Sequence, residues 1–172
     1  GGGSQAGLLV ELQVLDWCKE MLGFPRQATG LLVSGGSMAN LVGLAVARNA
    51  KAGYDVRAEG VNPARAALTL YASVETHSSV QKGVELLGLG NNALRKIPVD
   101  ADHRIDLDSL SAHVREDRAA GYRPFCVVGN AGTVNTGATD NLAALADFCE
   151  RERLWFHVDG AFGALVALVP SL

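Results

Sequence analysis

Short apolar segments of strand length alternate with segments of helical periodicity along most of the chain. Strands are predicted at residues 67–73, 94–99, 125–129 and 154–158. Helices are predicted between them, at residues 78–89, 107–120 and 142–153, with Asp106 as the N-cap of the second. Strands that are apolar on both faces need helices on both faces, so this order predicts an α/β fold with a mostly parallel sheet flanked by helices.

The N-terminal part of the chain predicts two further helices and one further apolar segment. Residues 5–22 carry Leu8, Leu12 and Leu15 at helical spacing, and Gly23 and Pro25 form a stop signal. Residues 38–52 are again periodic and rich in alanine and leucine. Between the two helices, a short apolar run precedes a Ser-Gly-Gly-Ser segment. We expect this run to end at the same edge of the sheet as the strands.

Composition argues against several classes of protein. The 172 residues are 48% hydrophobic and 19% charged, which is typical of a folded domain and not of a disordered chain. A net charge of −3 without a block of Lys or Arg argues against nucleic-acid binding. We expect neither a membrane span nor a signal peptide. Cys18, Cys126 and Cys149 are scattered, which predicts free thiols and a cytoplasmic location.

Four polar or glycine-rich segments are expected at one edge of the sheet. Parallel α/β sheets bind ligands outside the carboxyl ends of their strands. The segments that follow a predicted strand or apolar run lie at residues 34–37, 75–79, 130–137 and 159–163. Their common position predicts a ligand site at this edge.

Gly35, Gly36 and Ser37 open a predicted helix. Glycines allow a tight turn, and the first N–H groups of a helix attract an anion. An ordinary turn capped by Ser37 has the same pattern. The segment lacks the Gly-Lys-Ser/Thr ending of a P-loop and does not match the dinucleotide motif Gly-x-Gly-x-x-Gly. Thr133 lies in a glycine-flanked turn and is either a plain turn residue or a group that reaches the ligand.

His77 and Asp159 are the two main candidates for chemistry. His77 precedes a predicted helix and is either a capping or surface residue or a flat ring that stacks on a cofactor. Asp159 follows an apolar strand, so we expect its carboxylate to be partly buried and to need a partner such as a protonated ring nitrogen. His157 shares a face with Asp159 and either supports it or is a core histidine. The histidines show no zinc-like spacing, so no metal is expected.

An anion cradle, a flat ring and a buried negative charge are together what pyridoxal 5′-phosphate (PLP) requires. In their order and spacing, the motifs resemble the group II PLP-dependent amino-acid decarboxylases, which include the aromatic amino-acid, glutamate and cysteine-sulfinate enzymes. The resemblance covers nearly the whole chain and rests on the motifs Asp16-Trp17, Leu22-Gly23-Phe24-Pro25, Ser34-Gly35-Gly36-Ser37-Met38-Ala39-Asn40-Leu41, His77-Ser78-Ser79-Val80, Gly132-Thr133, Asp140-Asn141-Leu142 and His157-Val158-Asp159-Gly160-Ala161.

The resemblance implies the large domain of the aspartate-aminotransferase fold (fold type I), here incomplete, and a homodimer. The implied reaction is the PLP-dependent decarboxylation of an L-amino acid to the amine and CO2. Gly36 and Ser37 would hold the phosphate. The implied catalytic residues are His77 and Asp159. His77 would stack on the pyridine ring, and Asp159 would pair with the nitrogen of that ring. The full set of implied cofactor-binding residues is Gly36, Ser37, His77, Thr133, Asp159 and Ala161.

The family's cofactor lysine has no counterpart here. The family attaches PLP to a lysine in a His-Lys pair a few tens of residues after the aspartate, whereas residues 160–172 contain no lysine. The four lysines of the chain, Lys19, Lys51, Lys82 and Lys96, match no such motif. We therefore expect residues 1–172 to be part of the PLP-binding large domain. The lysine segment and the small C-terminal domain would lie outside this chain, which alone would be inactive.

Two other interpretations stay open. Another fold type I enzyme, such as an aminotransferase, a lyase or an aldehyde synthase, shares the aspartate and the phosphate cradle but differs in its product. A non-catalytic PLP-binding or assembly fragment is consistent with the missing lysine. The implied substrate is an L-amino acid of any side-chain class, and the lysine would come either from the same polypeptide or from a complementary chain.

Overall fold

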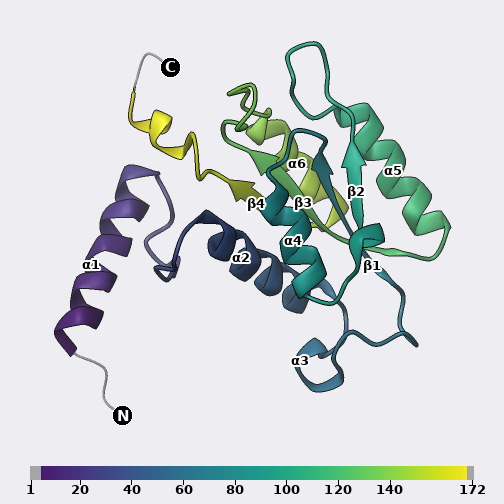
Figure 1. Ribbon diagram of the computed structural model, residues 1–172, viewed down its shortest axis with the longest axis horizontal. Coiled ribbons are helices and arrows are strands. Elements are labelled where there is room, and N and C mark those ends of the chain that lie inside the picture. The colour runs from purple at the N-terminus through teal and green to yellow at the C-terminus, as the bar shows by residue number, and fades with distance from the viewer. Residues whose placement is uncertain (1–4, 170–172) are drawn as a thin grey trace.

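The computed structural model describes residues 5–169 as a parallel sheet with helices on both faces (Figure 1). The strands are β1 (Leu68–Ser73), β2 (Leu94–Ile97), β3 (Arg123–Asn130) and β4 (Trp155–Asp159). Their order is β2-β1-β3-β4, and every neighbouring pair is parallel. The predicted α/β class is confirmed.

Two apolar clusters fill the two sides of the sheet. Helices α2 and α4 cover one face of the sheet, where Leu44 and Leu70 belong to one cluster. Helices α5 and α6 cover the other face, where Leu110 and Leu145 belong to the second cluster. Leu70 and its neighbour Tyr71 belong to opposite clusters because successive strand side chains alternate between the faces. The helical segments of this part are α2 (Gly36–Lys51), α3 (Val56–Glu59), α4 (Ser78–Leu86), η1 (Asn91–Ala93), α5 (Leu107–Ala119), α6 (Leu142–Glu152) and η2 (Ala164–Leu168).

Most predicted elements are present, with ends that differ by a few residues. Helix α4 ends three residues earlier than expected, and Gly88 then adopts a φ of 72°, which a helix cannot continue. Strand β2 ends directly before Pro98, whose nitrogen has no proton for the ladder. Asp106 caps α5 as predicted, because its carboxylate accepts the N–H of Ser109 at 2.6 Å. The sequence did not predict the single turn α3.

The short apolar run before the Ser-Gly-Gly-Ser segment, residues 29–33, does not behave like the strands of the sheet. Its residues form no strand and pair with none of β1–β4. Leu31 and Leu32 expose 55% and 53% of their surfaces, so this run is apolar without entering the core. The glycine segment that follows reaches the carboxyl edge of the sheet as the start of α2, which packs on β3 and β4.

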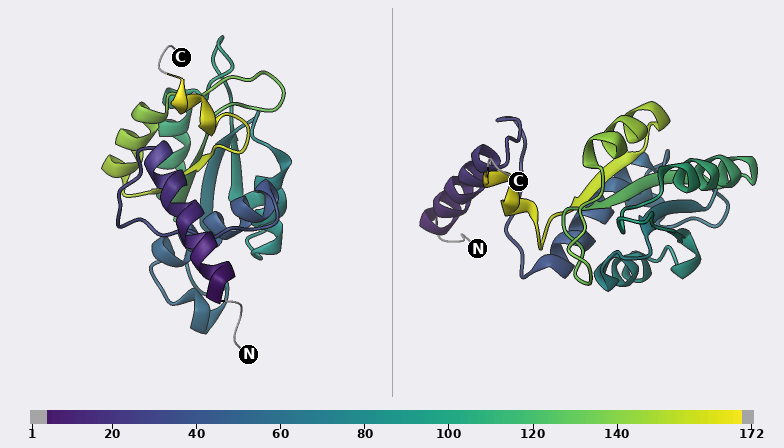
Figure 2. Two further views of the ribbon diagram at one scale, coloured as in Figure 1. Left: turned by 90° about the vertical axis from the view of Figure 1, so that its left-hand side faces the viewer. Right: turned by 90° about the horizontal axis from the view of Figure 1, so that it is seen from above.

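Helix α1 (Gln5–Met21) lies apart from the sheet, on the side of the molecule where η2 also lies (Figures 1 and 2). None of its residues is buried, and Leu9 and Trp17 expose 66% and 55% of their surfaces. It contacts the segment that follows it, where Glu11 accepts the N–H of Leu32 at 2.8 Å. The predicted helix is confirmed, but it adds nothing to the core. Within residues 5–169, no helix has the length and hydropathy to span a bilayer.

A buried carboxylate fixes the carboxyl end of β3. Asp140 is 4% exposed, and its Oδ2 accepts the backbone N–H of Asn130 at 2.7 Å and the Nδ2–H at 3.0 Å. Its Oδ1 accepts the N–H of Ile105 at 2.7 Å. The N–H of Asp140 also donates to the carbonyl oxygen of Asn130 at 2.9 Å. These bonds close the loop of residues 131–139 onto the last residue of the strand.

We expect Asp140→Asn to lower the free energy of unfolding by about 2–4 kcal/mol, because an amide group would then face buried N–H donors. Denaturant unfolding of the protein measures the loss. The matched control is Asp147→Asn on the exposed side of α6, for which we expect a change within about 0.5 kcal/mol. Equal stabilities of the two variants would show that Asp140 does not hold the loop.

Candidate active site

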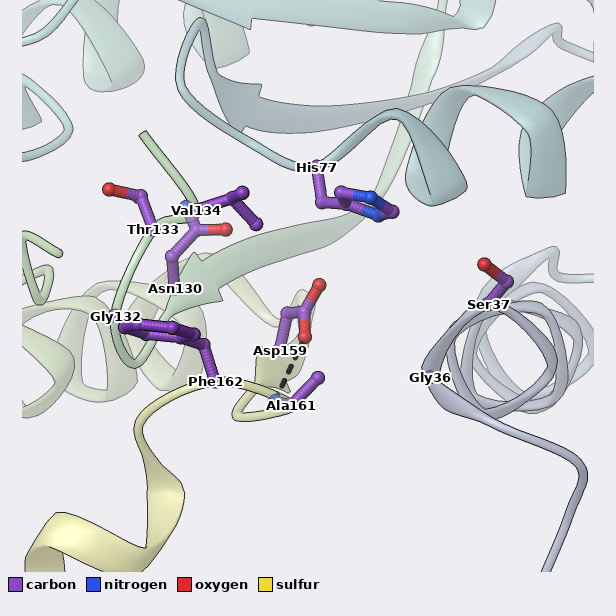
Figure 3. A pocket seen from close by; sticks show the side chains of 10 residues that line it. All are labelled: Gly36, Ser37, His77, Asn130, Gly132, Thr133, Val134, Asp159, Ala161 and Phe162. Carbon is purple, nitrogen blue, oxygen red and sulfur yellow. Dashed lines mark hydrogen bonds between the residues drawn. The ribbon is translucent and has the colours of Figure 1, made fainter. Parts of the chain in front are cut away.

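A cavity of about 270 Å³ lies at the carboxyl edge of the sheet (Figure 3). Its lining includes all six residues that the sequence predicted as cofactor-binding, Gly36, Ser37, His77, Thr133, Asp159 and Ala161. The remaining lining residues are Asn130, Gly132, Val134 and Phe162. The chain therefore brings the predicted residues together from the start of α2, the start of α4, the loop after β3 and the end of β4.

Asp159 is the last residue of β4 and is half-buried, as predicted. Its Oδ2 accepts Nδ2–H of Asn40 at 2.8 Å, and its Oδ1 accepts the backbone N–H of Ala161 at 3.2 Å. Among residues 5–169, no arginine or lysine forms an ion pair with it. A carboxylate at the edge of a cavity, held by neutral donors alone, is suited to a cationic partner in that cavity.

His77 is both a helix cap and a residue of the cavity lining. It is the N-cap of α4, and its Nδ1 accepts the backbone N–H of Ser79 at 3.2 Å. The same nitrogen lies 2.8 Å from Ser79 Oγ. The imidazole also lines the cavity, across from Asp159 and Ala161 (Figure 3). Capping therefore fixes the ring without removing it from the cavity.

The start of α2 offers a place for an anion. Gly35 is the N-cap residue with a φ of 94°, which favours glycine, and no side chain caps the helix. The alternative in which Ser37 caps the turn is therefore wrong. The N–H groups of residues 38 and 39 donate to Gly35 O, so Gly36 and Ser37 precede the first hydrogen bond of the helix. A Cβ on Gly36 would lie 3.3 Å from Cβ of Ala161, so glycine keeps this opening free.

Thr133 lines the cavity, but its hydroxyl does not reach into it. Thr133 is 3% exposed, and its Oγ1 lies 2.6 Å from Thr136 Oγ1. Its N–H donates to Ala138 O at 2.9 Å. In Figure 3 the hydroxyl points away from His77 and Asp159. This geometry favours the turn interpretation for the hydroxyl.

Two buried asparagines were not singled out by the sequence reasoning. Asn40 is 4% exposed and lies on the same side of α2 as the buried Leu44 and Ala47. Asn130 is 3% exposed, ends β3 and lines the cavity, and its Nδ2 donates to Thr76 Oγ1 at 3.1 Å. A polar residue at an apolar position of a helix, or at the end of an apolar strand, is the signal that identifies both.

His157 supports Asp159 through a third residue. Its Nε2 lies 2.8 Å from Asn40 Oδ1, and Asn40 in turn donates to Asp159. Burial lowers the pKa of His157, partly opposed by the negative charge of Asp159. The ring is therefore neutral at pH 7. Its contact with Asn40 is what a hydrogen-bonded core histidine makes, and it also connects the ring to Asp159.

No lysine lines this cavity among residues 5–169. Lys19 pairs with Asp16 at 2.7 Å, and Lys51 donates to Arg153 O at 3.1 Å. The other two lysines of the chain lie on α4 and β2. In the same part of the chain, no three His, Cys, Asp or Glu side chains gather closely enough to hold a metal ion.

Comparison with known proteins connects this geometry with a family. The family described as "Pyridoxal-dependent decarboxylase conserved domain" matches residues 4–171. The chain belongs to the pyridoxal-dependent decarboxylase family.

Members of this family share both sequence and fold with the chain. Aromatic-L-amino-acid decarboxylase from Bacillus atrophaeus is 45% identical over 155 residues, which covers 90% of this chain and 30% of the relative. The glutamate decarboxylase domain of diaminobutyrate-pyruvate transaminase and L-2,4-diaminobutyrate decarboxylase from Vibrio parahaemolyticus has a TM-score of 0.90 at 30% identity, covering 98% of this chain and 37% of that one. Oryza sativa TDC, solved with PLP and tryptamine, has a TM-score of 0.85 at 30% identity, covering 98% and 36%.

The chain spans about a third of the length of these relatives. The neighbours are pyridoxal-dependent decarboxylases of fold type I, so the predicted fold and the predicted family are confirmed. The role of each site residue stays a prediction, because the structure gives the position of the residue and not its function.

We expect stability to fall as the pH is lowered through the ordinary range of histidine. The pKa of His157 is lowered in the folded state, so the unfolded chain binds the proton more readily. The stabilisation is complete above the unfolded pKa of about 6.5 and is lost below it, by at most about 1.4 kcal/mol per pH unit. Denaturant unfolding of the full-length polypeptide between pH 8 and pH 5 (roughly the span of histidine titration) measures this loss.

His157→Gln is the control for this pH dependence, because its amide can donate to Asn40 but does not titrate. We expect the variant to show a smaller loss of stability at low pH than the parent. An identical pH dependence in both would remove His157 as the cause.

Proposed function

We propose that this chain forms part of the PLP-binding large domain of an enzyme that decarboxylates an L-amino acid to the amine and CO2. The observation that carries the proposal is one cavity lined by the start of a helix, an imidazole and a carboxylate that pairs with no Lys or Arg of residues 5–169. Membership of a pyridoxal-dependent decarboxylase family supports it. When bound, PLP supplies an electron sink for the pair left on Cα as CO2 departs.

The residues of the cavity fit a phosphorylated pyridine ring. Gly36 and Ser37 offer backbone N–H groups and a hydroxyl to the phosphate. His77 and Ala161, on opposite sides of the cavity in Figure 3, bound the space for the ring. Asp159 holds a proton on the ring nitrogen, because a half-buried anion favours the protonated form of its neighbour.

The remaining parts of the enzyme lie outside these residues. We propose that the amine that attaches PLP comes from another segment, since no lysine of the described residues lines the cavity. Helices α1 and η2 expose apolar side chains, among them Leu9 and Leu165. We propose that the rest of the large domain, or a second copy in a homodimer, covers these side chains. The three cysteines are free, which supports a reducing compartment, the cytoplasm.

We expect Asp159→Asn to reduce kcat for decarboxylation by about 100-fold or more. The substitution keeps an oxygen for the Asn40 contact but removes the negative charge that holds the proton on the ring nitrogen. The measurement is CO2 release from a panel of aromatic and acidic L-amino acids by the full-length polypeptide with PLP. Asp147→Asn is again the control. A kcat within about twofold of the control would exclude Asp159 from this role.

Product analysis in the same assay separates the decarboxylase from its alternatives. The proposal requires equal amounts of CO2 and amine. A keto acid without CO2 would indicate an aminotransferase, and an aldehyde with CO2 would indicate an aldehyde synthase. PLP binding without any product would leave a non-catalytic binding fragment as the function.

We expect His77→Asn to weaken PLP binding and to change the absorbance of bound PLP. Asparagine is a good N-cap and keeps α4 capped, so the substitution removes the ring and spares the helix. The loss of a stacked ring corresponds to about 0.5–1.5 kcal/mol, or roughly two- to tenfold in Kd. The control is His103→Asn in an exposed turn. Unchanged affinity and spectrum would contradict stacking by His77.

A further inference from the structure

We propose that Asn40 is a positioning residue of this site, because its side-chain amide links the Asp159 carboxylate and the His77 imidazole in one hydrogen-bonded network. This inference rests on the proposed function, which places those two residues at the ring of PLP. Asn40 itself is absent from the lining of the cavity. It acts through its neighbours and not through contact with a ligand.

The amide of Asn40 is buried and its hydrogen-bonding capacity is used. Nδ2 donates to Asp159 Oδ2 at 2.8 Å and to Ser79 Oγ at 2.9 Å. Oδ1 lies 2.8 Å from His157 Nε2. Asp159 and His157 belong to β4 and Ser79 to α4, so one side chain joins helix α2 to the strand of Asp159 and to the helix that His77 caps.

The Asp159 carboxylate fixes the orientation of this amide. An ionised carboxylate only accepts hydrogen bonds, so the nitrogen of Asn40 faces Asp159 and the oxygen faces His157. His157 must then donate from Nε2. Burial lowers the pKa of His157, and the negative charge of Asp159 only partly opposes this shift. A neutral ring with its proton on Nε2 therefore makes this bond.

The same amide reaches His77 through the hydroxyl of Ser79. Ser79 Oγ accepts a hydrogen bond from Asn40, so its own proton is available to His77 Nδ1, 2.8 Å away. That nitrogen also accepts the Ser79 backbone N–H at 3.2 Å, so it carries no proton. The tautomer of His77 with its proton on Nε2 fits both contacts. In this tautomer the imidazole adds no positive charge beside a protonated pyridine, where a second cation would be repelled.

Gly43, one turn after Asn40 on α2, leaves the space that the network needs. A Cβ at this position would lie 2.5 Å from Cε1 and 2.7 Å from Nδ1 of His157. The imidazole thus occupies the volume that another side chain would take. Glycine weakens the interior of a helix relative to alanine, and the approach of His157 to Asn40 gives this glycine a structural reason.

The decisive variant is Asn40→Asp in the full-length polypeptide. It keeps an acceptor for His157 and removes the donors to Asp159 and Ser79. We expect the Kd for PLP to rise about tenfold or more, equivalent to about 1.4 kcal/mol, and kcat to fall with little change in KM. Asn49→Asp, at an exposed position of the same helix, is the matched control.

A second readout needs no cofactor. In the apoprotein, ¹⁵N NMR of histidine should show His77 protonated at Nε2 and hydrogen-bonded at Nδ1, and Asn40→Asp should move the Nδ1 resonance as the Ser79 hydroxyl turns to the new carboxylate. Ser79→Ala removes the same hydroxyl without touching Asp159 and should move this resonance too. If Asn40→Asp does not fold, Ser79→Ala decides the link to His77.

The possible outcomes distinguish a failure of the Asn40 proposal from a failure of the proposed function. A Kd and a His77 resonance that match those of Asn49→Asp would overturn the role of Asn40. So would an unmoved resonance in a folded Ser79→Ala variant. If the parent protein binds no PLP, the proposed function fails, while the NMR measurement on the apoprotein still decides whether Asn40 controls His77.

Discussion

The half-buried carboxylate of Asp159, held by the amide of Asn40 and the backbone N–H of Ala161, is the interaction on which the rest of the site depends. Its donors are neutral, so its negative charge is preserved at the edge of the cavity. In a partly desolvated place, such a charge acts strongly on any ring nitrogen beside it. A lysine or arginine in place of Asn40 would neutralise the carboxylate and remove its effect on a ligand.

The parallel sheet explains why these residues meet. All four strands point the same way, so β3 and β4 end at one edge, and the chain places Asn130 and Asp159 there. Helices α2 and α4 begin at the same edge and bring Ser37 and His77. Asp140 then closes the loop after β3, which keeps Thr133 at the wall of the cavity. Residues that are far apart in the sequence therefore lie close together at this edge of the sheet.

The part of the chain outside this sheet is organised differently. Helix α1 and the segment of η2 expose apolar side chains that the described residues do not cover, and the chain spans about a third of its relatives. The sheet and its two helical layers, by contrast, have a complete core on each face. The cavity therefore belongs to the well-packed part of the structure, and no lysine of the described residues lines it.

The sequence by itself determined the elements whose pattern is local: the apolar strands, the amphipathic helices α4 to α6, and the polar segments after β1, β3 and β4. It also identified Asp159 and His77, because short motifs carry them. Tertiary structure alone decided that residues 29–33 are not a strand, that Thr133 turns its hydroxyl away, and that Asn40 and Asp140 hold the site. Asn40 and Asp159 are 119 residues apart, and a hydrogen bond over that distance leaves no periodic trace in the sequence, because it depends on how separate elements pack.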